Sequence, residues 1–493
     1  MMETQRIAAM YRDRVCSAEK AARLITSGMT LGVSGFAQVG YPKAVPQAIA
    51  KQGTKDLTVI GAASCGDEVD GALTRSGAVR CRFPYQSNKS MRAEINAGHI
   101  GYADMHLSHL PMAISCQNHR MDVAIIECVA VTEEGIYPAA SGGATNTLIR
   151  YADRVILEVN TSLPLSLMGM HDFFDPGVPP RGVVIPLTKP DQRIGKAFIP
   201  CQNEKIAAVV LSDGRDEPPV FKTPSAEHEQ IAEHIVAFLE KEVQAGRLPE
   251  TLGPIQSGVG GVANAVLYGL SRSHFKNLPM YTETLQDAAL SLLDDGTFCN
   301  ASTCCISLSA GKQAYFYQNI DNYRSRILIR NQDVTNHPEV IRRLGLISLN
   351  TPLEMDLYGN ANSTHVAGSK VVNGIGGSGD FARNARLNFF AAASTAKNGS
   401  ISSIVPLVSH VDHTEHDTQV FVTEQGIADL RWKTPLERAE AIIENCAHPS
   451  YRPALRAYLD RACRVSPGKH IPMDLSTAFS FHQKLIEQGD MRS

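Results

Sequence analysis

Val155-Ile-Leu-Glu-Val159 is a short run of mostly β-branched residues, and Val123-Ala-Ile-Ile126 and Ile206-Ala-Ala-Val-Val-Leu211 repeat this pattern before and after it. Short apolar runs without alternation are typical of strands buried on both faces of a parallel sheet. A fourth run, Leu57-Thr-Val-Ile60, has the same character. The segments between these runs that have a helical pattern are 44–51 and 92–98. Strands that alternate with helices predict an α/β fold on a largely parallel sheet.

The chain is 493 residues long, which is more than one ordinary hydrophobic core accommodates, so we expect two domains. The best boundary is Ser212-Asp-Gly-Arg-Asp-Glu-Pro-Pro219, which is rich in proline and charge. A long amphipathic helix follows, and the alternation of strands and helices then resumes. One face of this helix carries Ile231, Ile235, Phe238, Leu239 and Val243. We therefore predict two open α/β domains, residues 1–220 and 221–493.

The composition excludes several classes of function. Apolar residues make up 43% and charged residues 20% of the chain, and 47 basic against 50 acidic residues give a formal net charge of −3. The absence of a basic excess argues against nucleic-acid binding, and no apolar run reaches membrane-spanning length. The first 30 residues lack a secretory pattern, and Glu3 and Asp13 argue against a transit peptide. Eleven cysteines without Cys-x-x-Cys spacing fit reduced thiols, so we expect the cytoplasm or, alternatively, the mitochondrial matrix.

Met280-Tyr-Thr-Glu-Thr-Leu-Gln-Asp287 places a single carboxylate, Glu283, before an amphipathic segment. The pattern predicts Thr284 as a helix N-cap, with Asp287 completing a capping box, and therefore predicts Glu283 just outside a helix start. Two interpretations follow. Glu283 complements the positive end of the helix dipole, or it is a carboxylate nucleophile exposed at the edge of a cleft.

Two glycine-rich turns flank this segment, Gly258-Val-Gly-Gly-Val262 and Asn373-Gly-Ile-Gly-Gly-Ser-Gly-Asp380. Both match the G-x-G-x-x-G/A pattern of dinucleotide sites, so a nicotinamide-dependent dehydrogenase is one alternative. Neither turn follows a convincing strand-only run, which weakens that match. The same glycines can also bring backbone amides close to a phosphate or an oxyanion, or can simply form tight turns.

Ser409-His-Val-Asp-His-Thr-Glu-His-Asp417 contains three histidines among carboxylates and resembles a zinc site at first reading. On a helix His410 and His416 would lie far apart, and on a strand His413 would face away from both. The spacing matches no zinc motif, so we predict a hydrogen-bonded polar network and no metal.

With these motifs together, the chain resembles the acetyl-CoA hydrolase/transferase family, which consists of class I CoA-transferases. The resemblance extends almost from end to end. The segments that carry it are Val33–Pro46, Tyr281–Asp287, Thr335–Val340, Tyr358–His365, Asn373–Phe381, Ser409–Asp417 and Thr423–Arg431. It implies two open α/β domains of the CoA-transferase type, usually in a homodimer, with the nucleophile in the C-terminal domain.

The resemblance also implies roles for individual residues. Glu283 would become a glutamyl-CoA thioester, and Asn336 and Glu424 would orient the reacting groups. Gly377 would supply a backbone donor to the oxyanion, and Lys397 would neutralise a phosphate of CoA. The positions expected to contact CoA are Gly258, Val259, Gly260, Gly261, Val262, Asn373, Gly377 and Lys397.

The implied activity is ping-pong transfer of CoA between succinyl-CoA or acetyl-CoA and acetate or succinate. Acyl-CoA and short carboxylic acids would be substrates, with no permanently bound cofactor and no nucleic-acid or membrane partner. Net hydrolysis of acetyl-CoA and propionyl-CoA:succinate transfer are alternatives. The chain departs from relatives at Gly261, where Asn is frequent, at Thr284, where Val is frequent, and at Trp432, where Gly is common. Arg215 is a possible additional site residue.

Overall fold

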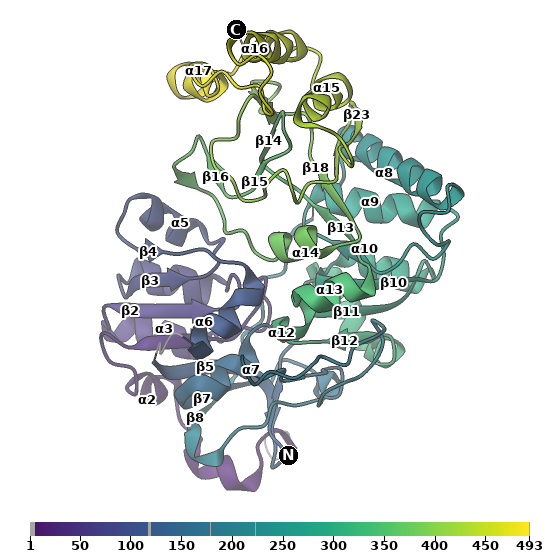
Figure 1. Cartoon of the computed structure of the whole chain (residues 1–493). Helices are drawn as coiled ribbons and strands as arrows, with labels where there is room; N and C mark the ends of the chain where they lie inside the picture. Colours follow the sequence, from purple (N-terminus) through teal and green to yellow (C-terminus); the bar gives the residue numbers. More distant parts are fainter. Residues whose placement is uncertain (1–4, 117–119, 178, 222, 493) are drawn as a thin grey trace. The chain divides into compact units, whose positions relative to one another are not determined.

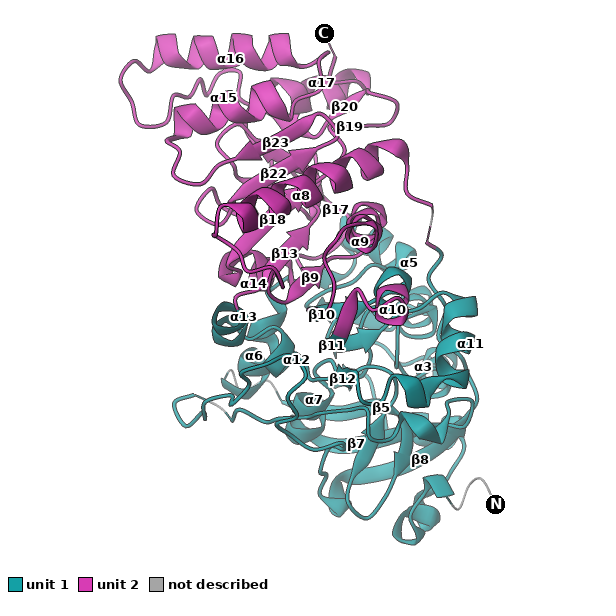
Figure 2. Ribbon diagram, turned by 90° about the vertical axis from the view of Figure 1, so that its right-hand side faces the viewer, with its two compact units in different colours: residues 1–220, 280–290, 300–344 teal, residues 221–279, 291–299, 345–493 magenta. Residues whose placement is uncertain are grey.

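The structure is a computed structural model that describes residues 5–116, 120–177, 179–221 and 223–492 (Figure 1). The chain forms two compact units (Figure 2). Unit 1 comprises residues 1–220, 280–290 and 300–344, and unit 2 comprises residues 221–279, 291–299 and 345–493. The chain passes from unit 1 to unit 2 after residue 220 and then returns twice to unit 1. The division into domains 1–220 and 221–493 stays a prediction. In the described part of the chain, no helix has the length and apolar character needed to cross a bilayer.

Unit 1 is built around an eight-stranded sheet in the order β4-β3-β2-β1-β5-β7-β8, with β6 paired to β5. All neighbours in this order are parallel, and β6 is antiparallel to β5. The strands are β1 (Thr30–Val33), β2 (Leu57–Gly61), β3 (Val79–Phe83), β4 (Gly101–Tyr102), β5 (Met121–Val131), β6 (Ile136–Pro138), β7 (Ala152–Asn160) and β8 (Ile206–Ser212). The helices of this part are α2 (Ala18–Ala22), α3 (Ala44–Gln52), α4 (Ala72–Arg75), α5 (Lys89–Asn96), α6 (Leu110–Cys116) and α7 (Thr145–Tyr151).

This sheet is buried on both faces, which explains its uninterrupted apolar runs. In β5, Val123 and Ile125 belong to one hydrophobic cluster, while Ala124 and Ile126 belong to another. Successive side chains of a strand point to opposite faces, so each cluster covers one face of the sheet. The four strand predictions and the helix predicted at 44–51 are confirmed by β2, β5, β7, β8 and α3.

The remaining part of unit 1 carries the segment around Glu283. Its elements are β10 (Leu278–Leu285), α10 (Asp287–Asp294), β11 (Phe298–Ile306), α11 (Ala310–Gln318), β12 (Ile327–Ile329), α12 (Gln332–Thr335) and α13 (Pro338–Leu344). Of these, β10, α10 and β11 also contribute residues to unit 2. Strands β11 and β12 are parallel.

Unit 2 contains the strand order β9-β13-β18-β22-β23, in which only β23 runs antiparallel to its neighbour within the described residues. These strands are β9 (Ile255–Ser257), β13 (Ile347–Asn350), β18 (Leu387–Ala391), β22 (Val420–Thr423) and β23 (Gly426–Asp429). The small strands are β14 (Glu354–Asp356), β15 (Ala361–Asn362), β16 (His365–Val366), β17 (Lys370–Val371), β19 (Thr395–Ala396), β20 (Ile401–Ser402) and β21 (Ile404–Val405). The helices are α8 (Ala226–Gln244), α9 (Gly261–Arg272), α14 (Ser378–Asn384), α15 (Pro435–Asn445), α16 (Arg452–Val465) and α17 (Ser480–Gln488). The prediction of an α/β chain with largely parallel strands is confirmed.

Candidate active site

Glu283 lies inside strand β10, and helix α10 begins four residues later at Asp287. The prediction that Glu283 precedes a helix capped by Thr284 is therefore wrong. The β-branched Thr284 extends the strand, and the Asp287 carboxylate accepts hydrogen bonds from the backbone N (2.9 Å) and Oγ (2.5 Å) of Ser309. Because helix-dipole effects fade within the first turn, the dipole interpretation of Glu283 loses its basis.

Two side chains hold Glu283. Nδ2 of Asn336 donates a 2.5 Å hydrogen bond to Oε1 of Glu283. The backbone carbonyl of Glu283 accepts a 3.0 Å hydrogen bond from Oγ1 of Thr303. Asn336 is fully buried and Glu283 is partly buried. The structure thus brings together two residues that the sequence placed in one site, 53 positions apart.

The other groups close to Glu283 stay protonated at neutral pH. Burial raises the pKa of Tyr85 to about 12, and the negative charge of Glu283 adds to this effect. Burial, the neighbouring Cys305 and the charge of Glu283 raise the pKa of the Cys304 thiol well above its usual value. Burial also raises the pKa of Cys305. No sequence motif marked these three residues as neighbours of Glu283, since their approach depends on segments that meet only in the folded chain.

Glu424 lies directly after strand β22 in unit 2, where Ser394 holds it. Both oxygens of the Glu424 carboxylate accept hydrogen bonds from Ser394, one from its backbone N (2.8 Å) and one from its hydroxyl. Nε2 of Gln425 donates a further bond of 3.0 Å. Burial would raise the pKa of Glu424, but these hydrogen bonds outweigh it and leave the pKa below the ordinary value. Glu424 is therefore a fixed, charged carboxylate, and nothing in the sequence marked Ser394 as its partner.

The turn that begins at Gly258 directly follows strand β9 and leads into helix α9, which begins at Gly261. The expectation that no strand precedes this turn is wrong, because β9 is only three residues long and was too short to recognise. Gly260 occupies the helix N-cap with φ 113° and ψ −173°, a conformation that is essentially restricted to glycine. Strands β9, β13, β18 and β22 are parallel, so the Gly258 turn and Glu424 lie at the same, carboxyl edge of the unit 2 sheet. This edge is where open α/β sheets bind ligands.

The neighbours of Gly260 have distinct surroundings. Val259 is 57% exposed, whereas Val262 is buried in α9. A Cβ atom at Gly261 would lie 2.7 Å from Cε1 of His228, so this histidine occupies the space that a larger residue would need. This contact gives the departure predicted at Gly261 a local steric setting.

The remaining predicted positions of unit 2 lie in loops. Nδ2 of Asn373 donates to the carbonyls of Ser363 (3.2 Å) and Gly374 (3.0 Å). Gly377 is the N-cap of α14, with φ −91°. Lys397 is exposed in the turn between the paired strands β19 and β20, with φ 48°. Arg215 is exposed in unit 1. The CoA contacts of Asn373, Gly377 and Lys397 stay predictions.

The three histidines of the 409–417 segment lie in different surroundings. His413 is buried, with Nε2 3.2 Å from Oγ of Ser378. The ring of His410 packs on the ring of His365 at 4.0 Å between centroids. His416 has an 82% exposed side chain. Among the described residues no cluster of His, Cys, Asp or Glu has the arrangement of a metal site.

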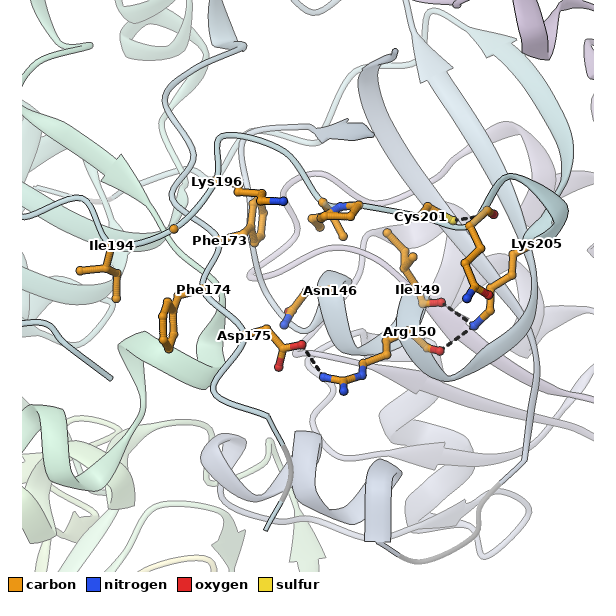
Figure 3. A pocket seen from close by; sticks show the side chains of 14 residues that line it. Asn146, Ile149, Arg150, Phe173, Phe174, Asp175, Ile194, Lys196, Cys201 and Lys205 are labelled. Carbon is orange, nitrogen blue, oxygen red and sulfur yellow. Dashed lines mark hydrogen bonds and ion pairs between the residues drawn. The ribbon is translucent and has the colours of Figure 1, made fainter. Parts of the chain in front are cut away.

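Unit 1 contains a cavity of about 640 Å³ (Figure 3). Its wall includes Phe173, Phe174 and Lys196, and the paired side chains of Arg150 and Asp175. None of the predicted site residues lines it.

Comparison with known proteins identifies the family. A family model for the acetyl-CoA hydrolase/transferase N-terminal domain matches residues 1–211, and one for the corresponding C-terminal domain matches residues 311–459. The chain is 48% identical, over 98% of its length and 90% of the relative's, to a succinyl-CoA:acetate CoA-transferase of Clostridium kluyveri. The chain belongs to the acetyl-CoA hydrolase/transferase family. The family resemblance read from the sequence is confirmed.

Other members of the family differ in their named activity. An acetyl-CoA hydrolase of Kluyveromyces lactis is 42% identical over 98% of this chain and 97% of that protein. A propanoyl-CoA:succinate CoA transferase of Escherichia coli is 40% identical over 96% of this chain and 98% of that protein. This family member is thus an enzyme of CoA transfer, with hydrolysis as a possible further activity, and the dehydrogenase alternative has no support among these relatives.

Solved structures agree on the fold. RipA from Yersinia pestis superimposes with a TM-score of 0.72 at 21% identity, covering 92% of this chain and 98% of that one. A 4-hydroxybutyrate CoA-transferase from Porphyromonas gingivalis gives a TM-score of 0.64 at 24% identity, with the same coverage. At such identities the likeness concerns the fold alone, which is of the CoA-transferase type as predicted.

Proposed function

We propose that this enzyme moves CoA between an acyl-CoA and a short carboxylic acid through a thioester on Glu283. Succinyl-CoA or acetyl-CoA is the donor, and acetate or succinate is the acceptor. The observation that carries the proposal is the 2.5 Å hydrogen bond from Asn336 to Oε1 of a partly buried Glu283 in a strand. The named activities of the relatives supply the substrate class.

The reaction proceeds in two symmetrical halves. The Glu283 carboxylate attacks the thioester carbonyl, and the C–S bond breaks. This step releases CoA thiolate and forms a mixed anhydride between Glu283 and the acyl group. The thiolate then attacks the glutamyl carbonyl of that anhydride, so the free acid leaves as a carboxylate and CoA remains on Glu283. A second carboxylate attacks the glutamyl thioester and repeats these steps in reverse order. No net proton is taken up or released, and the kinetics are ping-pong.

A carboxylate is a weak nucleophile, so geometry must supply most of the acceleration. The hydrogen bond from Asn336 fixes one oxygen of the Glu283 carboxylate. We assign the oxyanion contact to the backbone N–H of Gly377, and the orientation of the acyl group to Glu424. The turn from Gly258 to Val262, with Asn373 and Lys397, is assigned to CoA, because helix α9 begins there with free N–H groups that suit phosphate.

Hydrolysis of acetyl-CoA is the second candidate, supported by relatives that carry this name. Water would attack the same glutamyl thioester, so the two activities differ in how well the site excludes water. Measuring free CoA and newly formed acyl-CoA, with and without the acceptor acid, separates them, because transfer passes CoA to the acid and releases none. Transfer requires the acid, whereas hydrolysis proceeds without it.

The nucleophile is tested with Glu283→Gln, which preserves the shape of the side chain. We expect transferase activity to fall by several orders of magnitude and the mass adduct formed with succinyl-CoA to disappear. Peptide mapping after borohydride reduction should locate the reduced residue at position 283 in the parent enzyme. A Glu283→Gln variant with parental turnover would refute the assignment.

We also propose a homodimer in a reducing compartment, the cytoplasm, with no permanently bound cofactor. All eleven cysteines are free in the structure. Light scattering of the purified chain tests the dimer, because a homodimer has twice the mass of 53.4 kDa that one chain has.

A further inference from the structure

Thr335 contacts the side chain that holds Glu283. Thr335 is fully buried, and its Oγ1 lies 2.8 Å from Oδ1 of Asn336. An amide oxygen has no hydrogen, so the hydroxyl of Thr335 must be the donor in this bond. The same amide then presents its nitrogen to Glu283 on the other side.

The buried thiol of Cys304 is a second neighbour of Thr335, and burial keeps the pKa of this thiol well above its usual value. The sulfur of Cys304 accepts a 3.2 Å hydrogen bond from the backbone N of Gly143. Thr335 has one hydroxyl proton, and Oδ1 of Asn336 can only accept, so we assign that proton to the bond with Asn336.

The 2.8 Å contact with Thr335 favours one of the two orientations of the Asn336 amide. If the amide turned by 180°, its oxygen would face the Glu283 carboxylate, and the Thr335 hydroxyl would lose the acceptor that Oδ1 supplies. Mismatched polar groups are costly in a buried site.

We propose that Thr335 is a positioning residue, whose hydroxyl holds the Asn336 amide in the orientation that presents Nδ2 to Glu283. The proposal rests on the function proposed for Glu283. The sequence contains Thr335 next to Asn336 but gives no reason to separate it from other buried threonines.

Two substitutions separate positioning from packing. Thr335→Val keeps the branched shape and removes the hydroxyl, whereas Thr335→Ser keeps the hydroxyl and removes a methyl group. A packing role makes Thr335→Ser at least as harmful as Thr335→Val. A positioning role makes Thr335→Val the harmful change and lets Thr335→Ser restore activity.

The experiment measures kcat, KM for succinyl-CoA, and the pH dependence of kcat in the parent enzyme and both variants. We expect Thr335→Val to lower kcat about 10- to 100-fold, with KM changed less than about threefold, since the lost bond acts on the reacting carboxylate. The acid limb of the pH profile should move to higher pH, because the charged form of Glu283 loses a well-placed donor. Thr335→Ser should stay within about threefold of the parent enzyme.

Thr74→Val is the matched control, since Thr74 is also buried and its Oγ1 donates to the carbonyl of Asp70 in helix-rich surroundings of unit 1. It should leave kcat unchanged. In an Asn336→Ala background Thr335→Val should have no further effect on kcat, which is the signature of a shared interaction. If Thr335→Val does not fold, Thr335→Ala replaces it in the same comparison.

Parental kcat in Thr335→Val, or equal losses in Thr335→Val and Thr335→Ser, would overturn the proposal. Glu283→Gln distinguishes this outcome from failure of the proposed function. An active Glu283→Gln enzyme refutes the nucleophile, whereas an inactive one beside an active Thr335→Val enzyme refutes the positioning role alone.

Discussion

Nζ of Lys43 lies 2.7 Å from Oδ1 of Asp216, although the two residues are 173 positions apart. The same ammonium lies 2.6 Å from Oε1 of Glu127, and all three side chains are buried. Asp216 also accepts hydrogen bonds from the backbone N of Gly40. The segment predicted as a linker is thus fixed to unit 1 at Asp216, next to the exposed Arg215.

Lys43→Met should lower the free energy of unfolding by about 3–5 kcal/mol, because it leaves two buried carboxylates without their cation. Urea denaturation at pH 7 measures the change. Lys51→Met is the control, since Lys51 is exposed on helix α3, which begins directly after Lys43, and it should change stability by less than about 0.5 kcal/mol. Equal stability of the two variants would contradict a structural role for the cluster.

Asn336→Ala should lower kcat roughly 10²- to 10³-fold, the usual effect of losing one donor to a reacting oxygen. Asn336→Asp should lower kcat still further at neutral pH, since it places a second carboxylate beside Glu283. This variant should regain part of its activity as pH falls. Steady-state kinetics from pH 5 to 8 test both variants, with melting temperatures to confirm folding. Parental kcat in folded Asn336→Ala would show that the hydrogen bond has no catalytic role.

Gly260→Ala should weaken acyl-CoA binding. The backbone of Gly260, with φ 113°, disfavours any side chain by about 1–3 kcal/mol, although a Cβ there would meet no atom within 4 Å. We expect a higher KM for acetyl-CoA and a lower melting temperature. Gly311→Ala is the control, because Gly311 lies in helix α11 with equal space around it, and alanine should stabilise that helix. A parental KM in Gly260→Ala would remove this turn from the CoA site.

The buried His171 should make the free energy of unfolding depend on pH. It is fully buried, and burial lowers its pKa from 6.5 to about 4, against a smaller opposing effect of the 2.8 Å contact of Nε2 with the carbonyl of Ala139. The unfolded chain therefore binds this proton more readily than the folded chain does. The stabilisation is complete above pH 6.5 and is lost as pH falls toward 4.

Between pH 7 and pH 5 this histidine should account for a loss of roughly 2 kcal/mol in the free energy of unfolding. His171→Gln should remove that part of the pH dependence, as measured by urea denaturation at both pH values. His470→Gln, at an exposed position, should leave the dependence unchanged. An identical slope in His171→Gln and the parent protein would contradict the prediction.

Four strands of unit 1, β2, β5, β7 and β8, were predicted from the sequence because burial on both faces of a parallel sheet demands apolar runs. In β5, for example, alternate residues enter two separate clusters, so nearly every position must be apolar. Strand β9 was missed because three residues carry no periodicity. The helix start at residue 284 was predicted wrongly because local capping preference is weaker than the pairing of a buried strand.

Residue types and their order along the chain were enough to identify the α/β class and the family and to select Glu283 and Asn336 as candidate site residues. Only the folded structure shows that Glu283 lies in a strand and that Ser394 holds Glu424. It also shows that Thr335 contacts both Asn336 and Cys304. The physical reason is that a hydrogen bond depends on distance and direction in space. Residues brought together by neighbouring strands have no fixed separation in the chain, so no spacing rule can reveal them.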